Sequence, residues 1–319
     1  MKGIVALVAA VAAIAVLPGF VESYGLSFLV QTLIFVCLAY SWNLIGGYAG
    51  YAHFGQVAFF GLGAYVGALC IQAGVSWLVA PLIAAAFTAF VALVLGMIML
   101  RLSGVFFGIG MFGIARVCES LAMGLDGITA GGTGLYVEVA DLHMLYYVVA
   151  GLAVLIVALT WRLDSSRLGL QLLTIREDET AAAALGVRST QLKVGTFVLS
   201  ALMPGAVGSL YISYLGYIDP FTAFAMMTEL TTIAMVLLGG LGTVFGPLVG
   251  VVTLSVINEL LWARFPEIYL SLVGVIILVT ILYMPRGIVA YAQRKNWPLV
   301  PVARAHLRHF AQRIQEARK

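Results

Sequence analysis

Long runs of apolar residues, separated by short polar breaks, fill almost the whole of this 319-residue chain. Most runs approach the roughly 20 residues that an α-helix needs to cross a bilayer, and the alternation typical of membrane-spanning strands is absent. The pattern therefore predicts an all-α, polytopic transmembrane helical bundle with about ten spans. These predicted spans cover residues 4–20, 26–45, 55–72, 77–100, 104–123, 145–163, 193–214, 224–240, 246–263 and 267–284.

Two of these segments allow a second interpretation. Residues 1–20 hold one lysine and a short apolar run that ends at Pro18, so they form either a short first span or a signal peptide. Residues 216–240 contain Pro220, Glu229 and a pair of glycines. This second segment is therefore either a continuous span or a broken or re-entrant helix.

Composition agrees with the hydropathy pattern. Hydrophobic residues make up 62% of the chain and charged residues 10%, whereas soluble domains carry about a quarter charged residues. Backbone groups in lipid have to pair within the protein, because an unpaired group there costs several kcal/mol, and helices achieve this pairing. Cys37, Cys70 and Cys118 lie far apart in apolar runs, which indicates packing residues rather than a disulfide framework or a metal site.

The basic residues indicate which side of the membrane each loop faces. With a cytoplasmic N-terminus, 15 of the 17 Lys and Arg residues fall on the cytoplasmic side; Arg264 falls outside and Arg116 lies within a span. The outer loops carry acidic residues instead. This asymmetry obeys the positive-inside rule and predicts that both termini are cytoplasmic.

The same pattern divides the chain into three parts. Residues 1–286 form a predicted transmembrane domain, residues 164–192 a cytoplasmic loop within it, and residues 287–319 a basic cytoplasmic tail. Apolar residues recur at helical spacing among arginines in the tail, over 300–319. That spacing predicts an amphipathic helix on the inner membrane surface, with a partner contact as the alternative.

Residues 161–193 form the longest polar break in the chain. They hold five basic and four acidic residues, and within them residues 174–185 have the composition of a short helix. The acids come early, where they favour a helix N-terminus, and Gly186 follows an alanine-rich run. So much charge on one loop of a membrane protein predicts contact with a partner.

Polar residues and glycines inside the spans are candidates for lining a transport pathway, because charged groups in lipid are costly and usually face water or the bundle interior. Two Gly-rich segments, 46–64 and 239–250, permit either close helix packing or unwound turns beside a pathway. Arg116 and Glu119 are three residues apart on one helix face and can neutralise each other. The candidate pathway residues are Asn43, Gly50, His53, Gln56, Glu229, Gly239 and Gly240.

The chain shows no catalytic motif. It has no phosphate-binding loop of the Gly-x-x-x-x-Gly-Lys-Ser/Thr type, no cluster with metal-ligand spacing and no serine-nucleophile elbow. We therefore expect neither an enzyme nor a cofactor or metal bound by this chain. If ATP powers transport, another subunit binds it.

Five segments carry a family resemblance. They are SWNLIGGYAGYAHFGQVAFFGLGAY at 41–65, RLSGVFFGIGMFGIARV at 101–117, ITAGGTGL at 128–135, IREDETAAAALGV at 175–187 and VLLGGLGTVFGPLVGV at 236–251. In this order they resemble the permeases of branched-chain amino acid ABC transporters, in the LivM branch. The resemblance covers about residues 27–286, which is nearly the whole predicted membrane part.

The resemblance implies an ABC importer permease fold in the bacterial inner membrane. It implies two cytoplasmic ATPase subunits that use ATP, a homologous permease as a heterodimer partner and a periplasmic binding protein, with no nucleic acid. In such importers a short loop helix docks on the ATPase. The matching coupling positions are Glu177, Asp178, Glu179, Ala181, Ala182, Leu185, Gly186 and Lys193, with departures from the family pattern at Thr180 and Ala183.

Other functions remain open at this stage. Similar permeases serve urea, short amides or other amino acids, and the choice of substrate resides largely in the binding protein. An ion-coupled secondary transporter would use Glu229 or the Arg116–Glu119 pair as its coupling site. A passive channel would need a wide polar lining that this composition hardly supplies.

Overall fold

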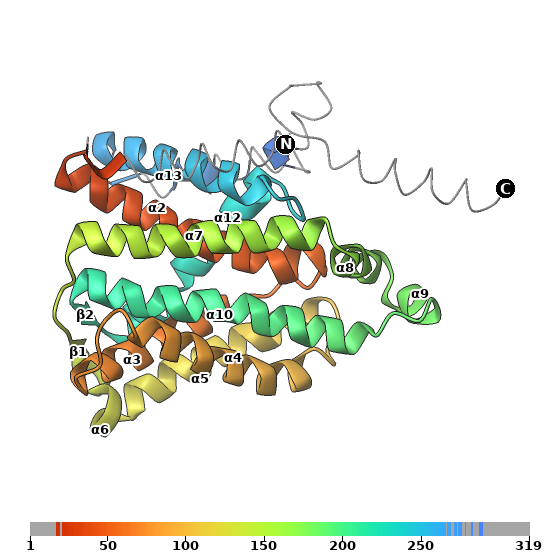
Figure 1. Ribbon diagram of the computed structural model, residues 1–319, viewed down its shortest axis with the longest axis horizontal. Helices are drawn as coiled ribbons and strands as arrows, with labels where there is room; N and C mark the ends of the chain where they lie inside the picture. The colour runs from red at the N-terminus through yellow and green to blue at the C-terminus, as the bar shows by residue number, and fades with distance from the viewer. Residues whose placement is uncertain are drawn as a thin grey trace.

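The computed structural model describes residues 17–19 and 21–265, together with 267–268, 271–272, 274–275, 278, 282 and 287–289. Seven helices in this described part are long and apolar enough to cross a membrane, and they lie side by side in a bundle (Figure 1). The predicted spans at 4–20 and 267–284, and the basic tail, fall largely outside the described residues. Each of the other eight predicted spans coincides with a described helix.

Helix α2 (Ser23–Trp42) is one of two central helices, and it continues into a π-helical turn, η2 (Asn43–Tyr48). It follows the short 3-10 turn η1 (Leu17–Gly19). Residues 36–49 are all buried, as expected for a helix that is apolar all round. Helices α7 (Leu142–Asp164), α12 (Met226–Gly239) and α13 (Gly246–Arg264) pack against α2.

Helix α10 (Ser189–Leu215) is the second central helix, and α3 (Gln56–Gln72) and α4 (Ala80–Met99) pack along it. Glycine permits the approach of α3, since a Cβ atom on Gly63 would lie 2.2 Å from the carbonyl oxygen of Gly205. Small residues let helix backbones come close in lipid. Gly63 therefore serves close packing, one of the two roles predicted for segment 46–64.

Helix α5 (Val105–Gly124) lies at the side of the bundle and presents large apolar side chains outward. Val105, Phe106 and Ile109 are 75%, 72% and 61% exposed within the chain. Such a face is costly in water but suits contact with lipid or with another membrane helix. The predicted Arg116–Glu119 ion pair forms on this helix.

Segment 216–240 is broken, which is one of its two predicted arrangements. Strand β2 (Tyr217–Ile218) pairs antiparallel with β1 (Leu135–Tyr136), so the described part departs from a purely helical fold by one two-residue ladder. The one-turn helix α11 (Pro220–Ala223) follows, before α12 begins. Asp219 stops the strand and caps α11, because its Oδ1 atom accepts a hydrogen bond from the amide of Phe221 at 2.9 Å.

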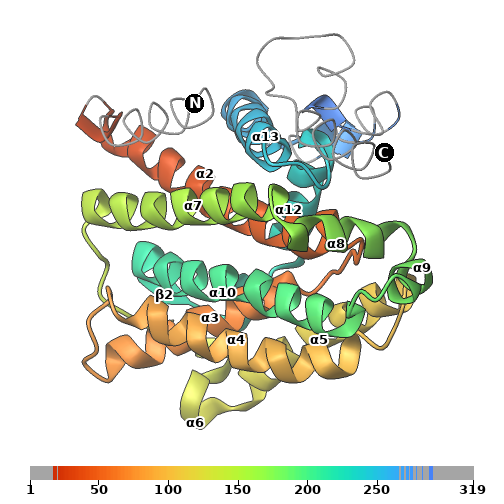
Figure 2. The same ribbon diagram turned by 45° about the vertical axis from the view of Figure 1, so that its right-hand side comes forward.

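The two ends of the bundle differ in structure and in charge. The ladder, α6 (Asp126–Thr129) and η3 (Gly131–Thr133) lie toward one end, and α8 (Arg167–Glu177) and α9 (Glu179–Ala184) lie at the other (Figures 1 and 2). The first end carries the acidic residues Asp126, Glu138, Asp141 and Asp219. The second end carries Arg101, Arg162, Arg167, Arg176 and Arg188 together with the acidic residues Asp164, Glu177, Asp178 and Glu179. The arginines used to predict sidedness therefore lie together at one end of the bundle.

Candidate functional site

The polar loop predicted to touch a partner folds into two helices rather than one. The sequence predicted a single helix over 174–185, whereas α8 ends at Glu177 and α9 starts at Glu179. Asp178 between them is extended, with φ −159° and ψ 111°, and its carboxylate accepts hydrogen bonds from the amides of Thr180 at 2.8 Å and Ala181 at 3.0 Å. Aspartate favours such capping over a helix interior, which explains the break.

Capping also affects the ionisation of Asp178. Hydrogen bonds from the Thr180 hydroxyl and from the Ala181 and Thr180 amides hold the pKa of this carboxyl below its usual value. The group therefore remains an anion at neutral pH, at the positive N-terminus of α9.

One face of α9 packs against its own chain. Ala182 is 1% exposed and belongs to a buried cluster with Leu172 and Ile175 of α8 and with Tyr48 and Phe107 of the membrane part. A methyl group in that position holds α9 against the bundle and is not available to another protein. Of the predicted coupling positions, Ala182 thus lies in the core.

The opposite face of α9 is open. Glu177, Asp178 and Ala181 are exposed, and Leu185 is 77% exposed at the end of the helix. Gly186 follows with φ +84°, a left-handed conformation that ends the helix and favours glycine. The eight predicted coupling positions therefore divide between an outward face and a set turned toward the bundle.

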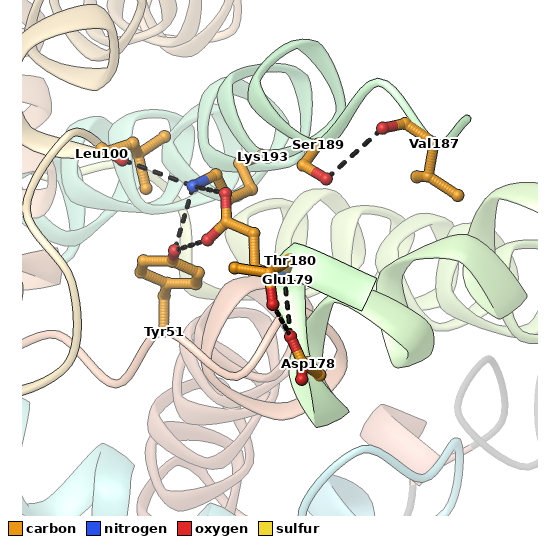
Figure 3. A network of polar contacts seen from close by, with 8 residues as sticks. All are labelled: Tyr51, Leu100, Asp178, Glu179, Thr180, Val187, Ser189 and Lys193. Atoms are coloured by element: carbon orange, nitrogen blue, oxygen red, sulfur yellow. Dashed lines mark hydrogen bonds and ion pairs between the residues drawn. The ribbon is translucent and has the colours of Figure 1, made fainter. Parts of the chain in front are cut away.

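Glu179 and Lys193 belong to the inward set (Figure 3). The Nζ atom of Lys193 donates hydrogen bonds to Glu179 Oε1 at 2.5 Å, to the Tyr51 hydroxyl at 2.9 Å and to the carbonyl oxygen of Leu100 at 3.4 Å. Tyr51 in turn donates to Glu179 Oε2 at 2.5 Å. The Lys193 side chain is only 5% exposed and that of Glu179 37% exposed, so a largely buried positive charge is neutralised and hydrogen bonded, as burial requires.

This network changes the pKa of Tyr51 and of Glu179, the two of its groups that lie outside the membrane spans. Burial, and then the bond to Glu179, raises the pKa of the Tyr51 hydroxyl. Burial alone would raise the pKa of Glu179, but hydrogen bonds from Lys193 and Tyr51 outweigh it and lower this pKa. The network is therefore a carboxylate, an ammonium group and a neutral phenol at pH 7. Tyr51 is not predictable as a member of this network from the sequence, because no local pattern marks a contact between residues so far apart.

A second anchor joins α8 to the turn after α2. Arg176 Nη1 donates a hydrogen bond to the carbonyl oxygen of Gly47 at 2.6 Å. The same side chain passes Gly50, where φ is +78° and a Cβ atom would lie 2.7 Å from Arg176 Cγ. Gly50, predicted as a pathway residue, thus makes room for this arginine.

Asn43 ties the same turn to the loop between α12 and α13. Its Nδ2 atom donates to the carbonyl oxygen of Thr243 at 3.1 Å, and its Oδ1 atom accepts from the amide of Gly242 at 2.8 Å. Gly239, another candidate pathway residue, lies where α12 meets α13, since a Cβ atom there would be 1.8 Å from the carbonyl oxygen of Gly246. Gly240 continues this turn with φ +129°.

The remaining pathway candidates are buried polar groups. His53 is 1% exposed and lies among aromatic rings, with centroids 6.2 Å from Phe107 and 6.0 Å from Phe197. Glu229 Oε2 accepts a hydrogen bond from the Val57 amide at 2.7 Å, at the start of α3. Gln56 and Glu229 line a cavity of about 10 Å³, which suits one water molecule and not an amino acid. Among the described residues, no three His, Cys, Asp or Glu side chains gather as a metal site.

A bundle of lipid-compatible helices, with a charged two-helix loop at one end, defines a multi-pass membrane protein. A family model described as "Branched-chain amino acid transport system / permease component" matches residues 24–282. The chain belongs to this family of ABC importer permeases, and it is accordingly a transport protein and not an enzyme.

Individual relatives agree with the family. The high-affinity branched-chain amino acid transport system permease protein LivM of Salmonella typhimurium is 27% identical over 85% of this chain and 71% of its own length. LivM of Escherichia coli K12 is 26% identical over 81% of this chain and 68% of its own length. LivH of Salmonella typhimurium is 30% identical over 47% of this chain and 48% of its own length. No solved structure matched the chain.

Proposed function

We propose that this chain is a permease subunit that imports branched-chain or related amino acids across the bacterial inner membrane. Separate ATPase subunits dock on α9 and supply the energy, a homologous permease completes the pathway, and a periplasmic binding protein delivers the substrate. Family membership and the names of the LivM relatives support this proposal. ATP is bound by the partner subunits.

One observation carries the docking role. Leu185, at the end of α9, is 77% exposed, and the exposed acidic residues Glu177 and Asp178 precede the helix. The inward face is fixed to the bundle through Ala182 and Glu179. A large apolar side chain at the tip of a charged loop has no packing role in its own chain. It fits an apolar groove on a partner whose rim carries basic residues.

Docking predicts a specific loss of assembly. Leu185→Asp should abolish co-purification of the ATPase subunits with the permease, because the change places a charge in a desolvated groove. Leu125→Asp is the matched control, since Leu125 is also an exposed leucine, at 47%, near the opposite end of the bundle. Retention of the ATPases by Leu185→Asp, measured by stoichiometry after affinity purification, would contradict docking on α9.

The groups suggested for ion coupling have structural partners. Arg116 pairs with Glu119 and donates to the carbonyl oxygen of Phe224 at 2.5 Å, and Glu229 caps the start of α3. These contacts give both groups a structural role, although Glu229 Oε1 is buried without a hydrogen-bond partner among the described residues. Family membership favours an ATP-driven importer over a secondary transporter. The same proposal covers a permease that imports urea or an amide instead of an amino acid, because the binding protein selects the substrate.

A further inference from the structure

Four charged side chains, each from a different helix around the polar loop, reach the same short segment. We name residues 43–53, which comprise η2 and the turn after it, the anchoring segment. The Tyr48 hydroxyl donates a hydrogen bond to Asp164 Oδ1 at 3.0 Å, and Arg176 donates one to the carbonyl oxygen of Gly47 at 2.6 Å. The Tyr51 hydroxyl donates a hydrogen bond to Glu179 and accepts one from Lys193. The ends of α7 and α8 and the starts of α9 and α10 thus converge on this segment.

The anchoring segment is also joined to the membrane core on its other side. Asn43 holds the backbone of the 242–243 turn between α12 and α13. The indole N–H of Trp42, at the end of α2, donates to the carbonyl oxygen of His53 at 3.0 Å and ties the end of the segment to α2. The His53 ring in turn packs edge-on against Phe107 of α5 and Phe197 of α10.

The backbone of the segment has features that are uncommon elsewhere in helices. η2 is a π-helix, a form that is rare and occurs frequently at functional sites. Gly50, at φ +78°, gives it a turn that only glycine adopts readily. Chains of hydrogen bonds and packed side chains can carry coupling between distant sites, and the contacts of the segment form such a chain.

We propose that the anchoring segment receives the movement of α8 and α9 and passes it to α2 and to the α12–α13 turn. Arg176 and Tyr51 are its positioning residues, and they act without touching either substrate or ATPase. This inference rests on the proposed function, because it needs an ATPase that moves the loop. It differs from docking in that Arg176 and Tyr51 act through hydrogen bonds within this chain.

The direct test measures how many substrate molecules enter per ATP hydrolysed by the assembled complex in proteoliposomes. Tyr51→Phe combined with Arg176→Leu removes the hydrogen bonds of Tyr51 and Arg176 but leaves the Tyr48–Asp164 bond, the Lys193–Glu179 pair and the docking face. The ratio should fall by about tenfold, as expected when hydrogen bonds to charged groups are lost, while ATPase subunits still co-purify. Tyr217→Phe is the control, because it removes one tyrosine hydrogen bond, 3.2 Å long, far from α9.

Rescue distinguishes positioning from general destabilisation. Arg176 makes a single hydrogen bond to a carbonyl oxygen, which an ammonium group can replace, so Arg176→Lys in the Tyr51→Phe background should recover much of the ratio. If the wild-type complex shows no ATP-driven uptake, the proposed function fails and this inference fails with it. If the wild type couples and the double variant keeps the wild-type ratio, only this inference is overturned.

A distance measurement tests the rigid connection without transport. Spin labels at Ala52 and Ala184, both exposed, should keep a constant separation when ATP binds, whereas the separation of Ala184 from Tyr136 at the opposite end should change. In the double variant the Ala52–Ala184 distribution should broaden. A change between Ala52 and Ala184 in the wild type as large as that between Ala184 and Tyr136 would overturn the inference.

Discussion

Lys193 explains why the loop helices take a fixed position on the bundle. Its side chain is 5% exposed, and a buried ammonium group requires an anion and further acceptors. Glu179, Tyr51 and the Leu100 carbonyl supply them. Because Glu179 remains partly in contact with water, which screens the attraction, the pair contributes little net stability, and its main effect is to fix the start of α9.

The inward face of α9 gives a prediction at the level of single residues. Ala182→Arg should destabilise the protein by roughly 2–4 kcal/mol, because it forces a long charged side chain into a packed cluster. Ala183→Arg, one residue along on the exposed side, should leave the midpoint of thermal unfolding in detergent almost unchanged. Equal midpoints for the two variants would show that Ala182 is not part of the core.

The sequence identifies the residues of the loop but not their orientation. Motif resemblance placed Glu179, Ala182 and Lys193 together with Leu185 in one coupling set. The structure turns the first three inward, because burial depends on contacts with Tyr51, Leu172 and Leu100. Such contacts are set by the packing of distant helices, and local spacing does not encode them.

At the scale of helices, glycine determines how closely neighbours approach. The α3–α10 contact depends on Gly63, which faces Gly205. The α12–α13 contact depends on Gly239 and Gly250, and a Cβ atom on Gly250 would lie 1.7 Å from the Met235 carbonyl oxygen. Without a hydrophobic driving force between helices in lipid, close packing of this kind supplies much of the association energy.

This packing predicts different results for two glycine-to-alanine changes. Gly63→Ala should destabilise the protein by about 1–3 kcal/mol, because the new methyl group overlaps the backbone of α10, which cannot move away by changing a rotamer. Gly113→Ala on α5, where a Cβ atom meets nothing within 4 Å, should be neutral or stabilising because alanine favours helix. Thermal unfolding in detergent measures both changes, and equal stability of the two variants would contradict the close approach.

Helix positions were largely predictable, and their interruptions were not. Apolar length alone located eight described helices, since each must cover the same hydrocarbon thickness. The break at Asp178 was missed because helix propensity summed over 174–185 hides one capping residue. Pro220 and the glycines signalled a broken 216–240 segment, but its pairing with Leu135 requires the tertiary structure.

For the whole molecule, the separation of charge between the two ends connects fold with function. Five arginines lie at the end that carries α8 and α9, together with the acidic residues of the polar loop, whereas the loops at the end with the β ladder carry acidic residues. The positive-inside rule predicts that the α8–α9 end is the cytoplasmic one, where ATP is present. The proposed energy input and the proposed anchoring segment then lie at the same end.

Uptake by the reconstituted complex tests this account most directly. Proteoliposomes that contain this chain, a homologous permease and the ATPase subunits would be supplied with a binding protein loaded with a radiolabelled branched-chain amino acid. Uptake should require ATP on the α8–α9 side and should persist when ionophores collapse proton and sodium gradients. Uptake by this chain without ATPase subunits, driven by an ion gradient and abolished by Glu229→Gln, would contradict the account.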